Sequence, residues 1–285
     1  MSTVVVEEVD RGKPRVRFVE LPQVLHAGDP RWAAPVLSWE RVRLDRHRNP
    51  YFEQAEVGLF LARRAGRPAG RIAAHVDPNG EGHFGFWTTV DDAAVAGGLI
   101  DAAREWLDEQ GCRSMTGPWS FDAATEPGVL VEGFDVGGTT GRPWRPSWEA
   151  ARLEGAGLVG IADTRTWRLA TTEVGPEPAT TSEQPAHAGP YGDPRLVLQG
   201  IAAVPDVSGA LRSTGLRSAW GLARRARQGR WDGCTVVRCS GRPEVVVPGL
   251  LVAAGRAGYR WVVAPWSPDP QAPPETVHRT YRLAW

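Results

Sequence analysis

Hydrophobic and polar positions change period along the first 170 residues, and each change predicts an element. Residues 55–78 alternate and break at RAGRPAG (64–70), which predicts two strands joined by a hairpin turn. Residues 82–90 and 112–121 predict further strands. Between them, the apolar residues of 93–111 recur at helical spacing, with Asp91 and Asp92 both suited to the N-cap and Gly111 to the C-terminal stop.

The rest of this half is less regular. Residues 15–25 favour a strand followed by the start of a helix, and residues 28–54 favour a proline-rich loop with a helical middle. Residues 146–170 predict a helix, a glycine stop and a closing strand. A helix between neighbouring strands requires a crossover, so we expect a local parallel pair in an otherwise antiparallel sheet.

Nearly the same six residues occur twice in the chain, as GPWSFD at 117–122 and APWSPD at 264–269. Each copy follows an alanine-rich apolar stretch and a short strand-like run. Each is followed by a similar closing strand, RTWRLA at 165–170 and RTYRLA at 279–284. The shared order indicates a duplicated unit, and the shorter spacing in the second copy indicates the loss of about one helix with its loop.

The predicted fold class is α/β of the α+β kind, with two domains at residues 1–170 and 195–285. Each is expected to be a mixed, mostly antiparallel sheet flanked by helices, and the second is shortened. Residues 171–194 are rich in Pro, Thr, Ser, Gly and Glu without periodicity, which is typical of a linker or long loop. Residues 210–231 form a basic stretch with interleaved Trp. It is either a solvated helix face that packs Trp220 inward, or a contact for an anionic ligand, a nucleic acid or a membrane surface.

Charge and cysteine content narrow the classes of partner. The chain carries 33 basic and 33 acidic residues, a balance unlike that of a nucleic-acid-binding domain. No stretch reaches about 18 uncharged apolar residues, so no membrane partner is expected. Three cysteines without a CxxC pair, and no export signal, favour a cytoplasmic protein. The six histidines form no HxxxH or HExxH pair, so their spacing proposes no metal site.

Several of these stretches carry a family resemblance. Residues 49–74 (NPYFEQAEVGLFLARRAGRPAGRIAA), 84–103 (FGFWTTVDDAAVAGGLIDAA), 128–135 (GVLVEGFD) and the closing AGYRWVVAPW…HRTYRLAW resemble the GCN5-related N-acetyltransferase (GNAT) superfamily in a tandem arrangement. In that superfamily an acyl-CoA donor lies between two splayed central strands. The resemblance implies acyl transfer to the amine of a small molecule, from acyl-CoA or from a thioester on a carrier protein, in bacterial specialised metabolism.

The superfamily holds the donor pyrophosphate with a loop patterned Q/R-x-x-G-x-G/A at the start of a helix, where unpaired N–H groups attract anions. The corresponding first-half residues, TTVDDAAVAGGLI, place Asp91 and Asp92 where a polyanion would approach. In the second half, CSGRPEVVVPGLL lacks the glycines but offers Arg242, the candidate contact for acyl-CoA. A chain without a donor site would use no cofactor.

Candidate catalytic groups follow the first copy of the repeat. Asp122 and Glu126 are four residues apart, and either one is a candidate general base for deprotonating an amine. The alternative is a solvated cap and a surface acid. His75 and His83 flank a short hairpin and are expected to face one another, as catalytic or as structural histidines. Tyr281 is a candidate acid or a packed residue of the closing strand.

Aromatic residues lie on or beside the central strands of both halves. Phe86, Trp87, Trp119, Trp261 and Trp266 are expected either to form the wall of a pocket for an apolar or cationic small molecule, or to fill the core. Three classes of function therefore stay open at this point. They are an acyltransferase, a cofactor-independent cyclase, isomerase or lyase on the same scaffold, and a non-catalytic small-molecule-binding protein.

Overall fold

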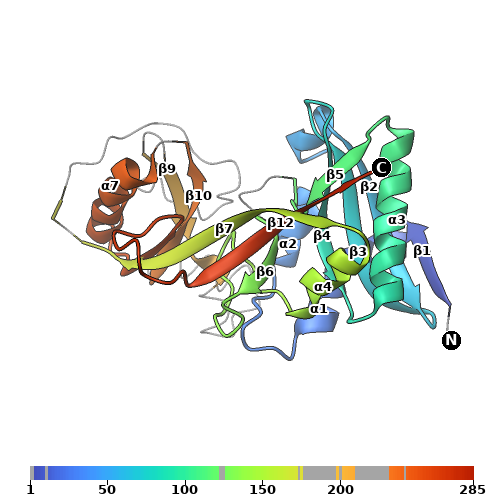
Figure 1. The fold of residues 1–285 in the computed structure, drawn as a ribbon, viewed down its shortest axis with the longest axis horizontal. Coiled ribbons are helices and arrows are strands. Elements are labelled where there is room, and N and C mark those ends of the chain that lie inside the picture. Colours follow the sequence, from blue (N-terminus) through green and yellow to red (C-terminus); the bar gives the residue numbers. More distant parts are fainter. Residues whose placement is uncertain are drawn as a thin grey trace.

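The structure, a computed structural model, describes residues 3–9, 12–121, 126–172, 174–175, 197–198, 201–208, 231–240 and 242–285 (Figure 1). The predicted linker at 171–194 and the basic stretch at 210–231 fall almost entirely outside these residues. The elements of the first half are β1 (Val4–Glu8), α1 (Gly12–His26), α2 (Leu37–Arg43), a 3-10 turn η1 (Pro50–Glu53), β2 (Glu56–Arg64), β3 (Arg67–Val76), β4 (Gly82–Thr89), α3 (Ala93–Glu109), β5 (Ser114–Gly117), β6 (Val129–Glu132), α4 (Trp148–Gly155) and β7 (Val159–Ala170). Those of the second half are β8 (Val197–Leu198), β9 (Ile201–Pro205), β10 (Gly233–Cys239), α7 (Pro243–Arg256), β11 (Trp261–Ala264) and β12 (Thr276–Ala284).

The two halves share one continuous sheet with the strand order β1-β2-β3-β4-β5-β12-β7-β11-β10-β9-β8, and β6 pairs with β12. Most neighbours are antiparallel. The parallel pairs are β4 with β5 and β10 with β11, and each is joined through a crossover helix, α3 or α7. The mixed, mostly antiparallel architecture in two related halves is thus confirmed, and the repeated PWS motif follows the second strand of each parallel pair.

The two closing strands are exchanged between the halves. The first closing motif, in β7, pairs with β11 of the second half, with Trp167 opposite Ala264. The second closing motif, in β12, pairs with β5 of the first half, with Tyr281 opposite Gly117. Figure 1 shows β7 and β12 running as a long pair from one half to the other. The boundary at residues 170–195 therefore separates the two halves in the sequence, whereas the sheet continues from one half into the other.

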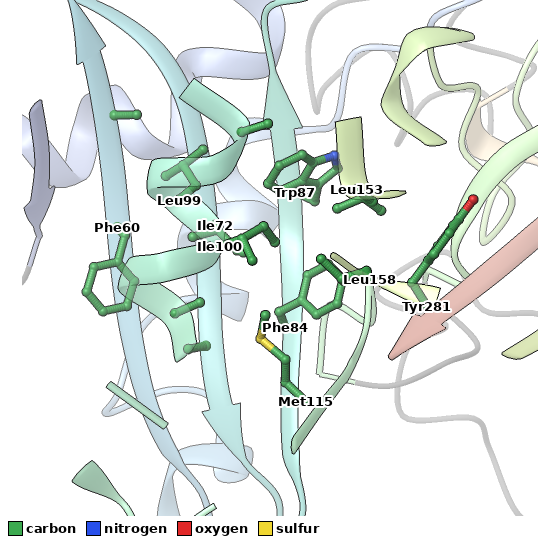
Figure 2. Packing of buried hydrophobic residues seen from close by; sticks show 14 of the residues in the cluster. Phe60, Ile72, Phe84, Trp87, Leu99, Ile100, Met115, Leu153, Leu158 and Tyr281 are labelled. Atoms are coloured by element: carbon green, nitrogen blue, oxygen red, sulfur yellow. The ribbon is translucent and has the colours of Figure 1, made fainter. Parts of the chain in front are cut away.

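Two cores pack against the first half of the sheet. On one face, α3 and α4 bury Trp87, Leu99, Ile100 and Met115 together with Tyr281 of β12 (Figure 2). On the other face, α1 and α2 cover a second cluster, which includes Phe18, Leu21, Leu44, Leu61 and Phe86. The second half has its own cluster around α7, which includes Ile201, Val247, Leu250 and Val262. Burial of this apolar area is the main force that stabilises the fold.

Local chemistry explains several element boundaries. The side chain of Asp92 accepts hydrogen bonds from the N–H groups of Ala94 and Val95, which confirms it as the N-cap of α3. Gly111 has a φ of +87° after the end of that helix, a conformation that favours glycine. The turn between β2 and β3 uses Ala65 and Gly66, both at positive φ, as a two-residue hairpin turn requires.

Two elements differ from the expectation. Residues 15–25 were expected to begin as a strand, but α1 covers them entirely. Phe18 and Leu21 are fully buried against β3 and β4 at helical spacing, and Val16 is half-exposed, so packing overrides the short alternation in RVRFV. The edge strand β1 was not expected from the sequence. Within the described residues, the longest apolar helices fall short of what a bilayer span requires.

Candidate functional site

A cavity of about 200 Å³ lies on the α1 and α2 face of the sheet, where the first half meets the second. Its charged lining comes from α2, β3 and the segments on either side of β6, namely Glu40, Arg43, Arg71, Glu126 and Arg145. Aromatic rings of Trp32, Phe86 and Trp144 and the polar residues His26, Thr88, Ser120, Thr139 and Ser208 complete most of the wall. A small space with so many buried charges is suited to a polar ligand.

The cavity sits beside a β-bulge in β4. The β3–β4 ladder pairs Arg71 with Thr88 and Ala73 with Gly85, so β4 holds one more residue than β3 between these pairs. Phe86, within the bulge, has a φ of +49°. Its N–H leaves the ladder and donates to Ser120 Oγ at 2.9 Å and to Glu126 Oε2 at 3.1 Å. Bulges re-aim groups in this way at many active sites.

The first PWS motif is held tightly against β4. The N–H of Trp119 donates to the Phe84 carbonyl at 2.6 Å. A Cβ on Gly85 would lie 2.0 Å from the Trp119 carbonyl oxygen, and a Cβ on Gly117 would lie 2.2 Å from the Phe84 carbonyl oxygen. Only glycine allows this approach. It brings Ser120, which follows Trp119, to the cavity.

Glu126 is the centre of a buried ionic group. It is 2% exposed, it contacts the Ser120 hydroxyl, and it forms an ion pair with Arg145. Arg145 also donates to the Trp87 carbonyl and lies 3.7 Å from Glu149 of α4. Burial raises the pKa of Glu149 to about 7, although the charge of Arg145 opposes this. The group couples the cavity to a carboxyl that titrates near neutral pH.

The other cavity charges come from α2 and β3. Arg43 pairs with Glu40 at 2.8 Å and donates to the Ser120 carbonyl at 2.8 Å. Arg71 donates to the Phe18 carbonyl at 2.8 Å, and its guanidinium lies over the rings of Phe18 and Phe86 at 5.1 and 5.7 Å. Burial lowers the pKa of Arg71 to about 9. The side chain thus stays charged at neutral pH.

His26 contributes a neutral imidazole. Its pKa is lowered to about 4, first by burial and then by the charges of Arg145 and Arg71. The ring lies 5.8 Å from Trp32 and 6.3 Å from Trp144. A neutral imidazole with aromatic neighbours is suited to orienting a ligand.

The second half supplies part of the wall and supports the rest. Asp206 accepts a hydrogen bond from the N–H of Thr140 at 2.9 Å, and the N–H of Ser208 donates to Thr140 Oγ1 at 3.1 Å. On β12, His278 Nε2–H donates to the carbonyl of the cavity residue Pro143 at 3.1 Å. The cavity therefore depends on residues from both halves.

The sequence-predicted site residues lie in different places. Glu126 and Phe86 line the cavity, and Asp122 is outside the described residues. His75 and His83 face one another as a ladder pair with rings 5.3 Å apart, but among the described cavity walls neither ring appears. His75 donates from Nε2 to the Trp119 carbonyl at 3.0 Å and accepts from Tyr51 at 2.6 Å on Nδ1. Burial lowers its pKa to about 3.

The remaining candidates pack in cores or on the surface. Trp87 and Tyr281 are fully buried on the α3 face, as Figure 2 shows, and the Tyr281 hydroxyl donates to Glu154 at 2.9 Å. Trp119 lies against His83, Trp261 lies 4.1 Å under the Arg168 guanidinium, and Trp266 packs against the second core. Of the five aromatic residues expected at a pocket, Phe86 is the one that lines this cavity.

The two crossover helices offer different N-termini to an anion. On α3, the carboxylate of Asp92 already accepts the first N–H groups and pairs with Arg64 at 2.9 Å. This end does not fit a donor pyrophosphate. On α7, the N-cap is the exposed Arg242, which makes no side-chain cap hydrogen bond. The α7 end is less obstructed for an anion than the α3 end, although Pro243 offers no N–H and Glu244 lies in its first turn.

A cluster of potential metal ligands lies at the turn between β3 and β4. Ligand atoms of Asp77, Glu81 and His83 lie within 4.8 Å of one another. The Asp77 carboxylate accepts N–H groups of Asn79 and Glu81, so the turn itself accounts for the position of this acid.

Most cavity residues were not singled out in the sequence. Arg43, Arg71 and Arg145 are three of many arginines, and no motif marks them. His26 stands alone in α1. The one available signal was the serine of the repeated PWS motif, since a duplicated Ser120 and Ser267 at equivalent strand ends marks a shared position.

No family model matches the sequence. Two curated relatives do. A bacterial ceramide synthase from Caulobacter vibrioides is 36% identical over 169 residues, which cover 56% of this chain and 44% of the relative. Protein YghO from Escherichia coli is 31% identical over 169 residues, which cover 57% and 43% respectively. The chain thus matches less than half the length of each.

Two solved structures resemble the whole chain at low sequence identity. A tandem GNAT protein from the clavulanic acid biosynthesis pathway has a TM-score of 0.52 at 11% identity, covering 99% of this chain and 98% of that protein. A GCN5-related glucosamine N-acetyltransferase region of a fungal multi-domain β-N-acetylglucosaminidase has a TM-score of 0.58 at 13% identity, covering 99% and 38%. The fold is therefore that of the GCN5-related N-acetyltransferases, in tandem.

Proposed function

We propose that this protein is an N-acyltransferase, which moves an acyl group from a thioester donor to the amine of a small molecule bound in the cavity. The observation that carries the proposal is the arrangement at the β4 bulge. There the buried carboxylate of Glu126, the hydroxyl of Ser120 and the N–H of Phe86 meet at the wall of a cavity. A base and a hydrogen-bond donor side by side are what amide formation needs.

In the proposed step, the amine nitrogen attacks the thioester carbonyl carbon. Glu126 takes the proton that the ammonium form must lose before attack. The Phe86 N–H, which is outside the sheet ladder, then donates to the carbonyl oxygen as negative charge develops there. The C–N bond forms, the C–S bond breaks, and the leaving thiolate takes up the second proton that the attacking nitrogen loses. Arg145 holds the Glu126 carboxylate in place through their ion pair.

Two further observations support acyl transfer. The fold is shared with acyltransferases, although a fold alone does not fix a reaction. The relative at 36% identity is named a ceramide synthase, and a ceramide is by definition an amide of a fatty acid with an amino alcohol. Since the match covers under half of that relative, the proposal takes from it amide formation and not its substrate.

For the donor we propose acyl-CoA, with a thioester on a carrier protein as the other candidate. The phosphates would bind near Arg242 at the start of α7, because Asp92 blocks the equivalent end of α3. Three cysteines without a CxxC pair fit a reducing compartment, and we propose the cytoplasm as the place of the reaction.

Two observations favour a different function. The Phe86 N–H already has Ser120 and Glu126 as partners, and the start of α3 is capped by its own chain. Both features would suit an enzyme that needs no donor, such as a cyclase, an isomerase or a lyase that uses Glu126 as its acid or base. Such an enzyme would release no thiol from acyl-CoA.

The first experiment measures thiol release from acetyl-CoA and from a long-chain acyl-CoA in the presence of a panel of primary amines. We expect amine-dependent release, lowered about 10²–10⁴-fold in Glu126→Gln through loss of the base. The matched control is Glu105→Gln, whose carboxylate lies on the exposed face of α3 and whose side chain is 72% exposed.

Calorimetric titration with acetyl-CoA and with free CoA locates the donor. We expect binding to the native protein and a loss of about tenfold in affinity in Arg242→Ala, which removes one charge-assisted contact. An absence of both CoA binding and thiol release would rule out CoA-dependent transfer. Activity with an acylated carrier protein would then separate the carrier-dependent reaction from the cofactor-independent one.

A further inference from the structure

We propose that the acceptor is an amino acid, whose carboxylate binds to Arg71 while its amine reacts beside Glu126. This inference rests on the proposed function and names the substrate class of the same cavity. It follows from the contrast between Arg71 and the two other arginines that line the cavity.

Arg43 and Arg145 are each neutralised by a carboxylate. Arg43 pairs with Glu40, and Arg145 pairs with Glu126 and lies near Glu149. Arg71 forms no ion pair with any described carboxylate, although its side chain is nearly buried at 5% exposure. A buried charge without a counterion is costly, so such a charge usually has a ligand or a function.

Arg71 also retains unused hydrogen-bonding capacity. One Nη atom donates to the Phe18 carbonyl, and among the described residues the buried Nε atom has no hydrogen-bond partner. A guanidinium presents five donors in a planar fork that matches a carboxylate. The rings of Phe18 and Phe86 lie near the guanidinium and hold it in one orientation. Arg71 is therefore already oriented, with unused N–H donors, to bind a carboxylate.

The electrostatic field at Arg71 agrees with this assignment. Its pKa is lowered to about 9, chiefly by burial, and the charges of Arg145 and Arg43 lower it further against the opposing effect of Glu40. An anion bound there would relieve this repulsion and partly replace the lost hydration.

The surroundings favour a monoanion that also carries an amine. Only one guanidinium lacks a carboxylate among the described cavity residues, and that suits a single negative charge. The lining holds three guanidinium groups, two of them paired with Glu40 and Glu126, so the one remaining positive charge is balanced by a single carboxylate. Glu126, the proposed base, is the acceptor for an ammonium group on the same ligand. A cavity of about 200 Å³ with three aromatic rings leaves room for the side chain of an amino acid.

The test is calorimetric binding without any acyl donor. Each common L-amino acid is compared with the amine that its decarboxylation gives, for instance L-phenylalanine with phenethylamine and L-leucine with 3-methylbutylamine. We expect at least one amino acid to bind about tenfold or more tightly than its amine, because only the acid engages Arg71. Sphinganine in detergent micelles represents a long-chain amino alcohol, which has no carboxylate.

Variants separate recognition from folding. Arg71→Gln should remove the preference for the acid. Arg71→Lys, which keeps the charge but not the planar fork, should retain part of it. Arg113→Gln, at a guanidinium that is 72% exposed, should bind like the native protein. Thermal melting of each variant checks that it is folded. If Arg71→Gln does not fold, the acid–amine comparison on the native protein still decides the question.

Equal binding of acids and amines across the panel, binding of no amino acid, or tighter binding of sphinganine would overturn the inference. These outcomes differ from a failure of the proposed function. Thiol release that depends on an amine without a carboxylate would keep acyl transfer and reject the amino-acid acceptor. Binding of an amino acid through Arg71 without any thiol release would keep the carboxylate site and reject acyl transfer.

Discussion

The two halves of the molecule use the same strand end for different purposes. In the first half, Ser120 of the PWS motif is buried, bonds to the bulged N–H of Phe86 and touches Glu126. In the second half, the equivalent Ser267 accepts a hydrogen bond from the N–H of Asp269 at 3.2 Å in a surface turn. The duplicated motif therefore preserves the end of a strand, whereas the chemistry around it has diverged.

The crossover helices α3 and α7, which join the strands of the two parallel pairs, also differ in how their N-termini are capped. The N-terminus of α3 is capped by Asp92, and that of α7 starts at Arg242 and Pro243 without a side-chain cap. The charged groups that line the cavity thus gather in the first half, and a helix start without a side-chain cap lies in the second. The comparison suggests a division of labour between two copies of one fold.

The largest loss of stability should come from substitutions in the exchanged closing strands, β7 and β12. Tyr281 is fully buried in the first core, and the equivalent Trp167 is only partly buried and donates to the Ala272 carbonyl. We expect Tyr281→Ala to lower the free energy of unfolding by about 3–5 kcal/mol through a large cavity, and Trp167→Ala by about 1–3 kcal/mol. Urea unfolding measures both.

Tyr281→Phe is the control for this pair. It keeps the ring and removes only the hydroxyl that donates to Glu154, so its cost should be about 1 kcal/mol. If Trp167→Ala lowered the free energy of unfolding as much as Tyr281→Ala, this would contradict the view that the first half depends more on β12 than the second half depends on β7.

A second prediction concerns α4, for which the second half has no equivalent between β11 and β12. Burial raises the pKa of Glu149 from 4.5 to about 7, so the native state binds this proton more tightly than the unfolded state does. The resulting stability is present below pH 4.5 and is lost as the pH rises through 7. We expect a loss of roughly 2–3 kcal/mol at this site between pH 5 and pH 8.

Glu149→Gln should remove that loss, because an amide does not titrate. The variant should be more stable than the native protein at pH 8 and similar to it at pH 5, as measured by urea unfolding at both values. Glu105→Gln, at an exposed carboxylate, serves as the control and should follow the native protein. A Glu149→Gln variant with the native pH dependence would show that this carboxyl is not the group responsible.

The smallest expected changes in stability come from substitutions at the N-termini of α3 and α7. Asp92→Ala should cost about 1 kcal/mol through loss of the cap, and Arg242→Ala should change stability by less than about 0.5 kcal/mol. Their effects on CoA binding should be reversed, with the loss confined to Arg242→Ala. Thermal melting and calorimetry on both variants provide the measurements. A loss of CoA affinity in Asp92→Ala alone would place the donor in the first half.

Local chemistry made much of the fold predictable from the sequence. The Asp92 cap, the turn at Ala65 and Gly66 and the helical period of 93–111 each depend on residues close in the chain. The strand exchange was not predictable in this way. RTWRLA and RTYRLA are so similar that either strand suits either neighbour, and period alone cannot say which neighbour it has.

The candidate site was predictable only in part. Glu126 follows the first PWS motif and Phe86 lies on a predicted strand, so sequence reasoning reached both residues. Arg71 lies in a strand in which alternation suggests only a polar position, and its isolation in the cavity comes from burial and from the bulge opposite. Such a property arises from three-dimensional packing and has no local signature.

The exchange of closing strands also affects the order in which the chain can be assembled during synthesis. β5 gains its neighbour β12 only after more than 160 further residues have been made, because Gly117 pairs with Tyr281. At about 5–20 residues per second, the ribosome leaves that edge of the sheet without its neighbour for roughly 10–30 s. During this interval the nascent first half presents an open strand edge to other chains. A chaperone that binds nascent chains would therefore be needed for the longest time at β5.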